Sequence, residues 1–326
     1  MKRFIKSFPV TLFLIFLSTF LSFSCREKTV APPRTVRIAI QPSAAFIPLY
    51  IARYSNQIED ALAPKNVTVV WQDFESGPPM NESLAADLTD IGVIGDVPTC
   101  LALSGDTKMR LVGIPASGPN AYALLARVDA DDFNSYKDLK GKKIATVFGS
   151  TGHNFVKKLL EKAGLTFDDV EFINITASSA EQVLAEHTAD AVAIWEPNVT
   201  RLLDKRIAKI IAQGSETNLR GTNGFVVRDE FLADNDDIIA EILNQYSIAV
   251  QKIDGLDPEM LAKLSQALNV TGPQIKTIAK KYDFSVRITS RDIDSLQDTI
   301  TFLVGINNIQ NAYRIGNFVD NGYFKE

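Results

Sequence analysis

Residues 143–165 read KIATVFGSTGHNFVKKLLEKAGL, and this stretch indicates the fold. The mostly apolar run Lys143–Phe148 predicts a β-strand. After the turn Gly149–Gly152, apolar residues recur at helical spacing until Gly164, a residue typical of a helix end. These positions are Phe155, Val156, Leu159, Leu160 and Ala163. A strand that leads directly into a helix is the repeating unit of α/β proteins with largely parallel sheets.

The same alternation extends in both directions along the chain. Further strands are predicted at Val36–Ile40, Val67–Trp71, Ile91–Ile94, Met109–Ile114, Tyr122–Val128, Val170–Ile175, Ala189–Trp195, Ile207–Ala212 and Gly224–Val227. After about residue 227 helical periodicity dominates, as in Ile238–Val250 and in the stripe that starts near Ser290, with Ser290 or Asp292 as the expected cap. The sequence therefore predicts an α/β fold with a mostly helical C-terminal region.

The N-terminus has the layout of a secretory signal peptide. Basic residues at the tip are followed by the apolar run Phe8–Phe23, whose 16 residues are fewer than the roughly 20 of a membrane-spanning helix. Ser24 and Cys25 come next, and Leu21–Cys25 resembles the lipobox of bacterial lipoproteins. We expect residues 1–24 to be a signal peptide and residues 25–34 a tether that is lipidated at Cys25. An uncleaved anchor, or a cut near Ser24 that leaves a soluble protein, are the alternatives. All three place the remainder outside the cytoplasm.

Composition narrows the classes of partner. Removing residues 1–24 takes away three of the 34 basic residues and none of the 39 acidic ones, which leaves a net charge of about −8. This charge argues against a nucleic-acid partner and against electrostatic adhesion to anionic lipid. Cys25 and Cys100 are the two cysteines and His153 and His187 the two histidines, so we expect no disulfide framework, no metal site and no cofactor.

Five loops with small or polar residues follow predicted strands. Open α/β sheets bind ligands at the carboxyl ends of their strands, and the coincidence of five such loops therefore indicates a binding site. Each loop by itself also fits an ordinary capped helix, and Trp195 alone is more often a core residue. The loops supply the residues Gln41; Gly77 and Pro78; Gly95 and Asp96; Ser150, Thr151, Gly152 and His153; and Trp195 and Glu196.

The loop Gly149–Gly152 has the features of an anion site. The first amides of a helix lack internal partners and lie at its positive dipole end. We expect these amides, with the Ser150 and Thr151 hydroxyls as additional donors, to bind an anionic group, and Gly152 to let the backbone approach the ligand. Asp96 is expected to cap the helix that it opens.

The order of these motifs resembles a known family. Ser76-Gly77-Pro78, Gly95-Asp96-Val97-Pro98, the Asp138–Lys143 turn, Gly149–His153, Lys162–Leu165 and Ile194–Pro197 follow one another as they do in the extracytoplasmic solute-binding proteins of ABC importers, in the aliphatic sulfonate, taurine and nitrate group. The resemblance covers roughly residues 35–320. Glu196 departs from it, because sulfonate binders tend to have Asp there.

The resemblance implies a two-lobed periplasmic-binding-protein fold with two crossing strands and the solute in the cleft. Lobe one would comprise residues 35–125 and 222–326 and lobe two residues 126–221, with crossings at Tyr122–Val128 and just before Phe225. The loop residues named above would bind a small anion, Trp195 would cover its apolar part, and Glu196 would meet an amino group or cap the lobe. The protein, expected to be a monomer without enzymatic activity, would deliver the solute to a permease and its ATPase. Its lipid would be the sole attachment to the outer face of the cytoplasmic membrane.

Three alternatives remain open from the sequence. Importers of thiamine-pyrimidine or riboflavin precursors share this fold and would stack a flat ring on aromatic residues. An enzyme on the same fold, of the kind that makes a thiamine pyrimidine precursor, would need a cluster of lysine, histidine and cysteine that the sequence lacks. A membrane sensor in place of a permease is the third possibility.

Overall fold

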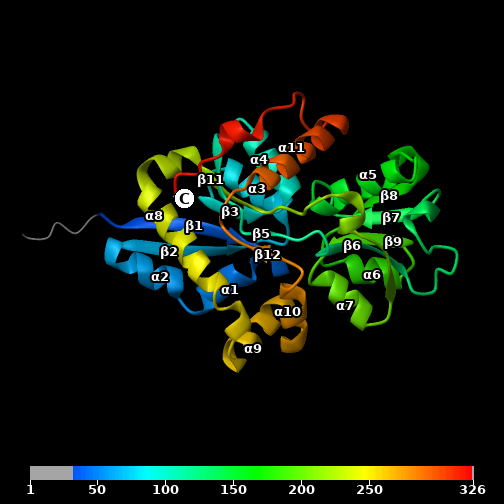
Figure 1. The fold of residues 1–326 in the computed structure, drawn as a ribbon, viewed down its shortest axis with the longest axis horizontal. Helices are drawn as coiled ribbons and strands as arrows, with labels where there is room; N and C mark the ends of the chain where they lie inside the picture. Colours follow the sequence, from blue (N-terminus) through cyan, green and yellow to red (C-terminus); the bar gives the residue numbers. More distant parts are fainter. Residues whose placement is uncertain (1–31, 325–326) are drawn as a thin grey trace, which may run out of the picture. The chain divides into compact units, whose positions relative to one another are not determined.

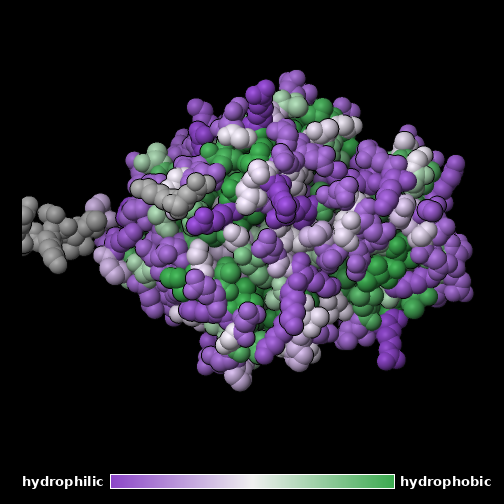
Figure 2. All heavy atoms as spheres, viewed as in Figure 1, coloured by the Kyte–Doolittle hydropathy of each residue, from purple (hydrophilic) through white to green (hydrophobic). Residues whose placement is uncertain are grey.

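The structure is a computed structural model that describes residues 32–324. Pro33–Glu326 form one compact unit. The expected signal peptide and Cys25 lie outside the described residues. No helix within residues 32–324 combines the length and the apolar character needed to cross a membrane. Hydrophilic residues cover most of the face shown in Figure 2.

The first sheet has five strands in the order β2-β1-β3-β11-β4 (Figure 1). Its strands are β1 (Arg34–Ile40), β2 (Val67–Asp73), β3 (Ile91–Ile94), β4 (Met109–Gly113) and β11 (Gly224–Arg228). Strands β2, β1 and β3 are parallel, whereas β11 runs antiparallel to both of its neighbours. Alternate residues of β1 enter different core clusters, Ile38 on one face and Ala39 on the other, because successive side chains of a strand point to opposite faces.

The second sheet also has five strands, in the order β10-β6-β9-β7-β8. Its strands are β6 (Tyr122–Arg127), β7 (Lys143–Thr146), β8 (Glu171–Asn174), β9 (Ala191–Trp195) and β10 (Ala208–Gln213). Strands β8, β7 and β9 are parallel, and β6 runs antiparallel between β9 and β10. Helices cover both faces of each sheet, and two apolar clusters per sheet form the cores. The α/β prediction is confirmed.

The chain passes between the sheets twice, between Gly113 and Tyr122 and between Gln213 and Gly224. The expected crossing strand Tyr122–Val128 is instead a strand of the second sheet, because β6 pairs with β9 on one side and β10 on the other. The crossing segments carry the short strand β5 (Ala116–Ser117), which pairs with β12 (Asp283–Phe284).

Helices fill the connections between these strands (Figure 1). Those packed with the first sheet are α1 (Ile47–Tyr54), α2 (Gln57–Leu62), α3 (Gly77–Ala85), α4 (Asp96–Ser104), α8 (Asp229–Val250), α9 (Pro258–Leu268), α10 (Gly272–Ala279) and α11 (Ser290–Gly305). Those packed with the second sheet are α5 (Thr151–Lys162), α6 (Ala180–Ala185) and α7 (Asn198–Asp204). Short 3₁₀ helices lie at Ala44–Phe46, Ala63–Lys65, Tyr136–Asp138, Phe167–Asp169, Gly214–Thr217, Ile253–Gly255 and Ile315–Phe318.

Helix ends differ from the predictions at two places. The cap of α11 is Thr289, whereas Ser290 or Asp292 was expected; Asp292 instead completes a reciprocal capping box as the third helical residue. Gly95 occupies the cap position of α4, and Asp96 is its first helical residue. Differences of one or two residues are the usual uncertainty of a helix boundary.

Candidate functional site

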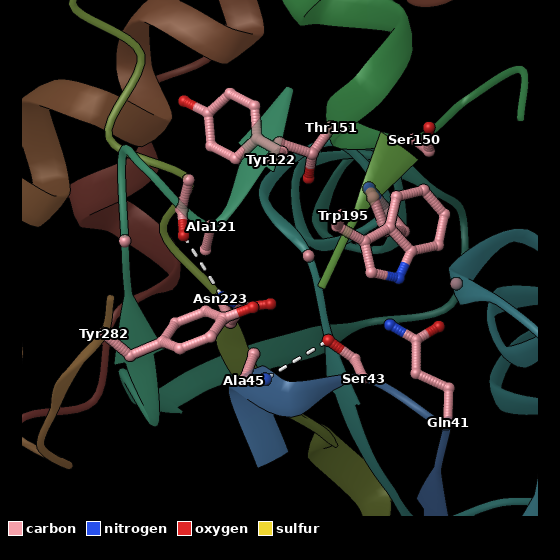
Figure 3. A pocket seen from close by; sticks show the side chains of 15 residues that line it. Gln41, Ser43, Ala45, Ala121, Tyr122, Ser150, Thr151, Trp195, Asn223 and Tyr282 are labelled. Carbon is pink, nitrogen blue, oxygen red and sulfur yellow. Dashed lines mark hydrogen bonds between the residues drawn. The ribbon is translucent and has the colours of Figure 1, made fainter. Parts of the chain in front are cut away.

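A cavity lies where loops from the carboxyl ends of both sheets meet (Figure 3). The volume in which the centre of a water molecule fits is about 40 Å³. A water needs roughly 10–15 Å³ of such volume, and the cavity therefore has room for a small solute group. Its wall residues are Gln41, Ser43, Ala45, Gly77, Gly95, Pro98, Gly118, Ala121, Tyr122, Ser150, Thr151, Trp195, Gly221, Asn223 and Tyr282.

Three helices direct their N-termini at this cavity. Gly77 opens α3, Gly95 caps α4 and Thr151 opens α5, and all three line the wall. Within the described residues the backbone amides of Gly77, Ser150 and Thr151 have no protein acceptor. Unpaired amides at positive dipole ends form a binding site for an anion without a cationic side chain.

The hydroxyls of the α5 turn are not additional donors, contrary to the sequence prediction. Ser150 Oγ accepts the Gly152 amide at 3.2 Å and donates to Val147 O at 2.6 Å. Thr151 Oγ1 donates to Asp96 Oδ1 at 2.5 Å. Each hydroxyl has a single hydrogen, already used within the protein, and the donors left to a ligand are therefore the amides.

Side chains from both halves add polar groups to the cavity wall. In Figure 3 the amide nitrogen of Gln41 and the indole nitrogen of Trp195 face one another beside the Ser43 hydroxyl. Gln41 is only 6% exposed, and its Oε1 has no partner in the part of the chain described. Gln41 and Trp195, both expected at the binding site, line this cavity.

Tyr122, Asn223 and Tyr282 also line the cavity and were not among the residues expected there. Asn223 lies on the return crossing, where its side chain donates to Ala116 O and Gly221 O at 3.2 Å. Tyr122 donates its hydroxyl to Leu219 O. Asn223 directly precedes a predicted strand, which was an available signal, whereas Tyr282 follows a C-terminal helix and matches no motif.

Pro78 and Gly152 are not on the wall. Pro78 packs beside the α5 turn, since a Cβ at Gly149 would lie 3.7 Å from its ring. A Cβ at Gly152 would lie 2.4 Å from Thr146 Oγ1 and 2.9 Å from Ala193 O. Gly152 therefore allows α5 to approach its own sheet and does not bring backbone to a ligand.

His153 also lies behind the wall. It packs among Phe148, Phe167, Phe172 and Phe302, with ring centroids 5.0–5.4 Å away. Burial lowers the pKa of His153 from 6.5 to about 4, and the ring is therefore neutral near pH 7. Its Nδ1 accepts the Gly149 amide at 3.3 Å and so orients the turn, in which Gly149 has a φ of 71°.

Glu196 and Asp96 are fully buried carboxylates and do not line the cavity. Glu196 pairs with Lys281, and it accepts the Thr200 amide and hydroxyl, both at 3.0 Å. It therefore links the two sheets and has no need of a ligand amino group. Asp96 accepts Thr151 Oγ1 and the Val97 amide, the latter at 2.8 Å.

The wall carries no acidic or basic side chain. The buried carboxyl groups of Asp96 and Glu196 are not part of it. No group of His, Cys, Asp and Glu suited to a metal ion occurs among residues 32–324. The arrangement is suited to holding one negative charge with neutral donors.

Comparisons with known proteins identify the family of the chain. The chain matches the family described as NMT1/THI5 like over residues 79–253, more than half of its length. A "Putative aliphatic sulfonates-binding protein" of Bacillus subtilis (strain 168) is 30% identical over 296 residues, 90% of this chain and 88% of that protein.

Solved structures share the fold. The alkanesulfonate-binding protein SsuA from Xanthomonas axonopodis pv. citri, bound to MOPS, has a TM-score of 0.81 at 22% identity and covers 89% of this chain and 99% of its own. The desulfurization enzyme DszB in complex with biphenyl-2-sulfinic acid has a TM-score of 0.67 at 16% identity, with coverage of 90% and 98%. These likenesses confirm the periplasmic-binding-protein fold. The family matches confirm the resemblance found in the sequence, and the chain belongs to the NMT1/THI5 like family.

Proposed function

We propose that the protein is the extracytoplasmic solute-binding component of an ABC importer and that it captures a small sulfonate-type monoanion. Two curated relatives bear the name "Putative aliphatic sulfonates-binding protein", which supports the solute class. Taurine and nitrate belong to the same range of candidates. The two lobes proposed to close on the solute are those expected from the sequence, residues 35–125 with 222–326 and residues 126–221, except that residues 122–125 move to the second lobe with strand β6.

The observation that carries the proposal is a neutral wall onto which three helix N-termini converge. Preorganised amides replace the hydration of an anion without a counter-charge. The fully buried carboxylate of Glu196 behind the wall disfavours a second negative charge on the solute. The small cavity favours a short solute, with the Trp195 indole beside its apolar part.

Closure is supported by contacts between the halves outside the cavity. Lys158 Nζ on α5 lies 2.5 Å from Asp298 Oδ2 on α11. Ser178 Oγ, before α6, donates to Glu75 Oε1, after β2, at 2.5 Å. An open state would lack such contacts, and an anion that binds amides from both halves would shift the population toward the closed state. The permease would then recognise that state.

A binding role without catalysis is supported by the chemistry of the wall. Cys100, the thiol within the described residues, is fully buried in the core of the first sheet, and burial raises its pKa well above the ordinary value. A thiol held protonated is a poor nucleophile. The structural likeness to the enzyme DszB therefore does not support an enzymatic role for this chain.

Calorimetry with short solutes tests the function. Methanesulfonate, ethanesulfonate, taurine, nitrate and sulfate are titrated into the mature protein, after a thermal-shift screen in which a solute at 100 times its Kd adds about 2.7 kcal/mol of stability. We expect the sulfonates to bind and sulfate to bind more weakly. Riboflavin and a thiamine pyrimidine are included, and tighter binding of either would overturn the proposed solute class.

A wall variant locates the site. Gln41→Leu removes the amide that faces Trp195, and we expect the Kd for the best sulfonate to rise about tenfold, the loss of one hydrogen bond of ~1.4 kcal/mol. Gln182→Leu is the matched control, because Gln182 bonds only Glu186 on the surface of α6. Equal Kd values for both variants would place the anion elsewhere.

Lipidation at Cys25 is part of the proposal, with attachment to the outer face of the cytoplasmic membrane. A Cys25→Ala variant is expected to be released as soluble protein or to keep its signal peptide. Fractionation and migration identical to wild type would contradict lipidation. The monomeric state is checked on the same preparation by light scattering.

A further inference from the structure

We propose that closure over the solute anion binds a proton at Asp96, so that solute capture by this protein is proton-linked. The inference rests on the proposed function and concerns a group that does not touch the solute. Asp96 is a positioning residue: it holds Thr151, the first residue of α5, through the hydrogen bond that joins the two halves beside the cavity.

Asp96 is a buried charge without a cation. It is 0% exposed, and within residues 32–324 no lysine, arginine or histidine nitrogen approaches its carboxylate as an ion pair. Transfer of an unpaired carboxylate from water into such a site is costly, and such a group is commonly neutralised instead. Burial raises the pKa of Asp96, in spite of its bonds from Thr151 and Val97.

The number of hydrogens available for hydrogen bonds around Asp96 also favours its protonated form. Thr299 Oγ1 on α11 lies 3.4 Å from Asp96 Oδ2 and 3.2 Å from Ser295 O, and both are acceptors when Asp96 is ionised. A hydroxyl has one hydrogen and serves one of them. With a proton on Oδ2, Asp96 donates to Thr299, and Thr299 donates to Ser295 O. Every oxygen in this chain of bonds is then satisfied.

The second half contributes a further polar group to this cluster. Asn154 on α5 is 0% exposed, and its Nδ2 lies 3.5 Å from Thr299 Oγ1. Its Oδ1 has no partner in the described structure. Since Thr151 and Asn154 come from one half and Asp96 and Thr299 from the other, the cluster assembles only when the halves meet.

The solute strengthens the effect. In an open state Asp96 would face water and ionise with a pKa near the ordinary value of ~3.9. Closure removes that water and places a second negative charge at the same helix N-termini. Because two nearby like charges disfavour each other in a dry site, one of them takes up a proton, and a sulfonate is too weak a base to do so.

Other titratable groups near Asp96 do not supply this proton. Cys100 and Tyr122 are the groups that interact with it electrostatically, and burial raises the pKa of each, which keeps both neutral near pH 7. Lys158 and Asp298 form a pair where α5 meets α11. His153 packs against Phe302 of α11 as well as against aromatic rings of its own half, and burial lowers its pKa. Any burial that closure adds at His153 would release a proton there, the opposite sign to the uptake at Asp96.

Calorimetry of methanesulfonate or taurine binding in two buffers of different ionisation enthalpy measures the protons bound per solute. It is run at pH 6, 7 and 8 on wild type and on Asp96→Asn, and the difference isolates Asp96, since the His153 contribution is common to both. We expect wild type to bind up to about one proton more than the variant. Between the open-state and closed-state pKa values of Asp96, the wild-type Kd should rise about tenfold per pH unit.

Asp298→Asn is the matched control, because it removes an exposed carboxylate that also joins the two halves, from α11 to α5. It should keep the proton uptake of wild type. Solute binding with equal proton uptake in wild type and Asp96→Asn would overturn the inference and leave the proposed function intact. If Asp96→Asn does not fold, wild type alone decides. Solute binding without net proton uptake over pH 6–8, after any release from His153 is allowed for, would also overturn the inference. No binding of any sulfonate would refute the proposed function, and the inference with it.

Discussion

The two sheets have equivalent strand orders but differ in the loops that lead from their strands into helices. Each has three parallel strands, β2-β1-β3 in the first and β8-β7-β9 in the second, followed by an inserted antiparallel strand, β11 or β6. In the first sheet the third strand leads to α4, which starts with the buried carboxylate of Asp96. In the second sheet the central parallel strand, β7, leads to α5, which has Ser150 as its cap and no acid in its first turn.

The difference between the two sheets lies in the residues at the N-termini of α4 and α5. Similar scaffolds bring the N-termini of α4 and α5 together beside the cavity, and two positive dipole ends repel each other. Asp96 reduces that repulsion by accepting a bond from Thr151, while the free amides of α5 remain for an anion. The sheets bring the two N-termini together. The start of α4 supplies a hydrogen-bond acceptor, and the start of α5 supplies free donors.

Gly152→Val should have the largest effect on stability, because it disrupts the packing of α5 against the second sheet. The new Cβ would lie 2.4 Å from Thr146 Oγ1 and 2.9 Å from the Ala193 carbonyl, and backbone on one side prevents relief. We expect loss of more than about 4 kcal/mol of stability or failure to fold. Thermal unfolding by circular dichroism measures this.

Gly95→Ala is the corresponding change at the α4 end. Its Cβ would lie 2.9 Å from Thr151 Oγ1, the end of a side chain that can turn away. This variant should fold and should weaken solute binding because it disturbs the bond from Thr151 to Asp96. A Gly152→Val protein as stable as Gly95→Ala would refute the tight contact of α5 with its sheet.

Lys281→Met tests the ionic link between the two halves. Glu196 is fully buried, and removal of Lys281 leaves its charge without a counter-ion, at a cost of about 3 kcal/mol. Chemical denaturation gives the value. Lys157→Met, which breaks an exposed pair with Glu161 on α5, should cost less than about 0.5 kcal/mol. Similar losses in the two variants would show that the Glu196 pair is not a structural link.

His153 predicts a smaller, pH-dependent effect in the second half. Its pKa in the folded state, about 4, is below the ordinary 6.5, so the unfolded chain takes up a proton first as the pH falls. Stability from this group is full above pH 6.5 and decreases down to about pH 4, by up to about 3 kcal/mol. His153→Asn, which can still accept the Gly149 amide, should flatten this part of the stability curve. An unchanged slope between pH 6.5 and 4 would contradict the burial of a neutral ring.

Much of the fold was predictable from local patterns. The strands of both sheets are close to their predicted positions, because periodicity and turn residues act within a few neighbours. The five loops at strand ends were placed correctly near one another, since parallel strands present their carboxyl ends at one edge. Gln41, Gly77, Gly95, Ser150, Thr151 and Trp195 do line the cavity.

The sequence by itself determined the α/β alternation, the family and the loops that meet at the cavity. Only the tertiary structure decided which groups in those loops remain free for a ligand. Ser150 and Thr151 use their hydroxyl hydrogens internally, and Glu196 pairs with Lys281, 85 residues away in the chain. The reason is physical: a pattern reports the bonds that a residue makes with near neighbours, whereas a hydrogen shared between distant elements depends on how those elements pack.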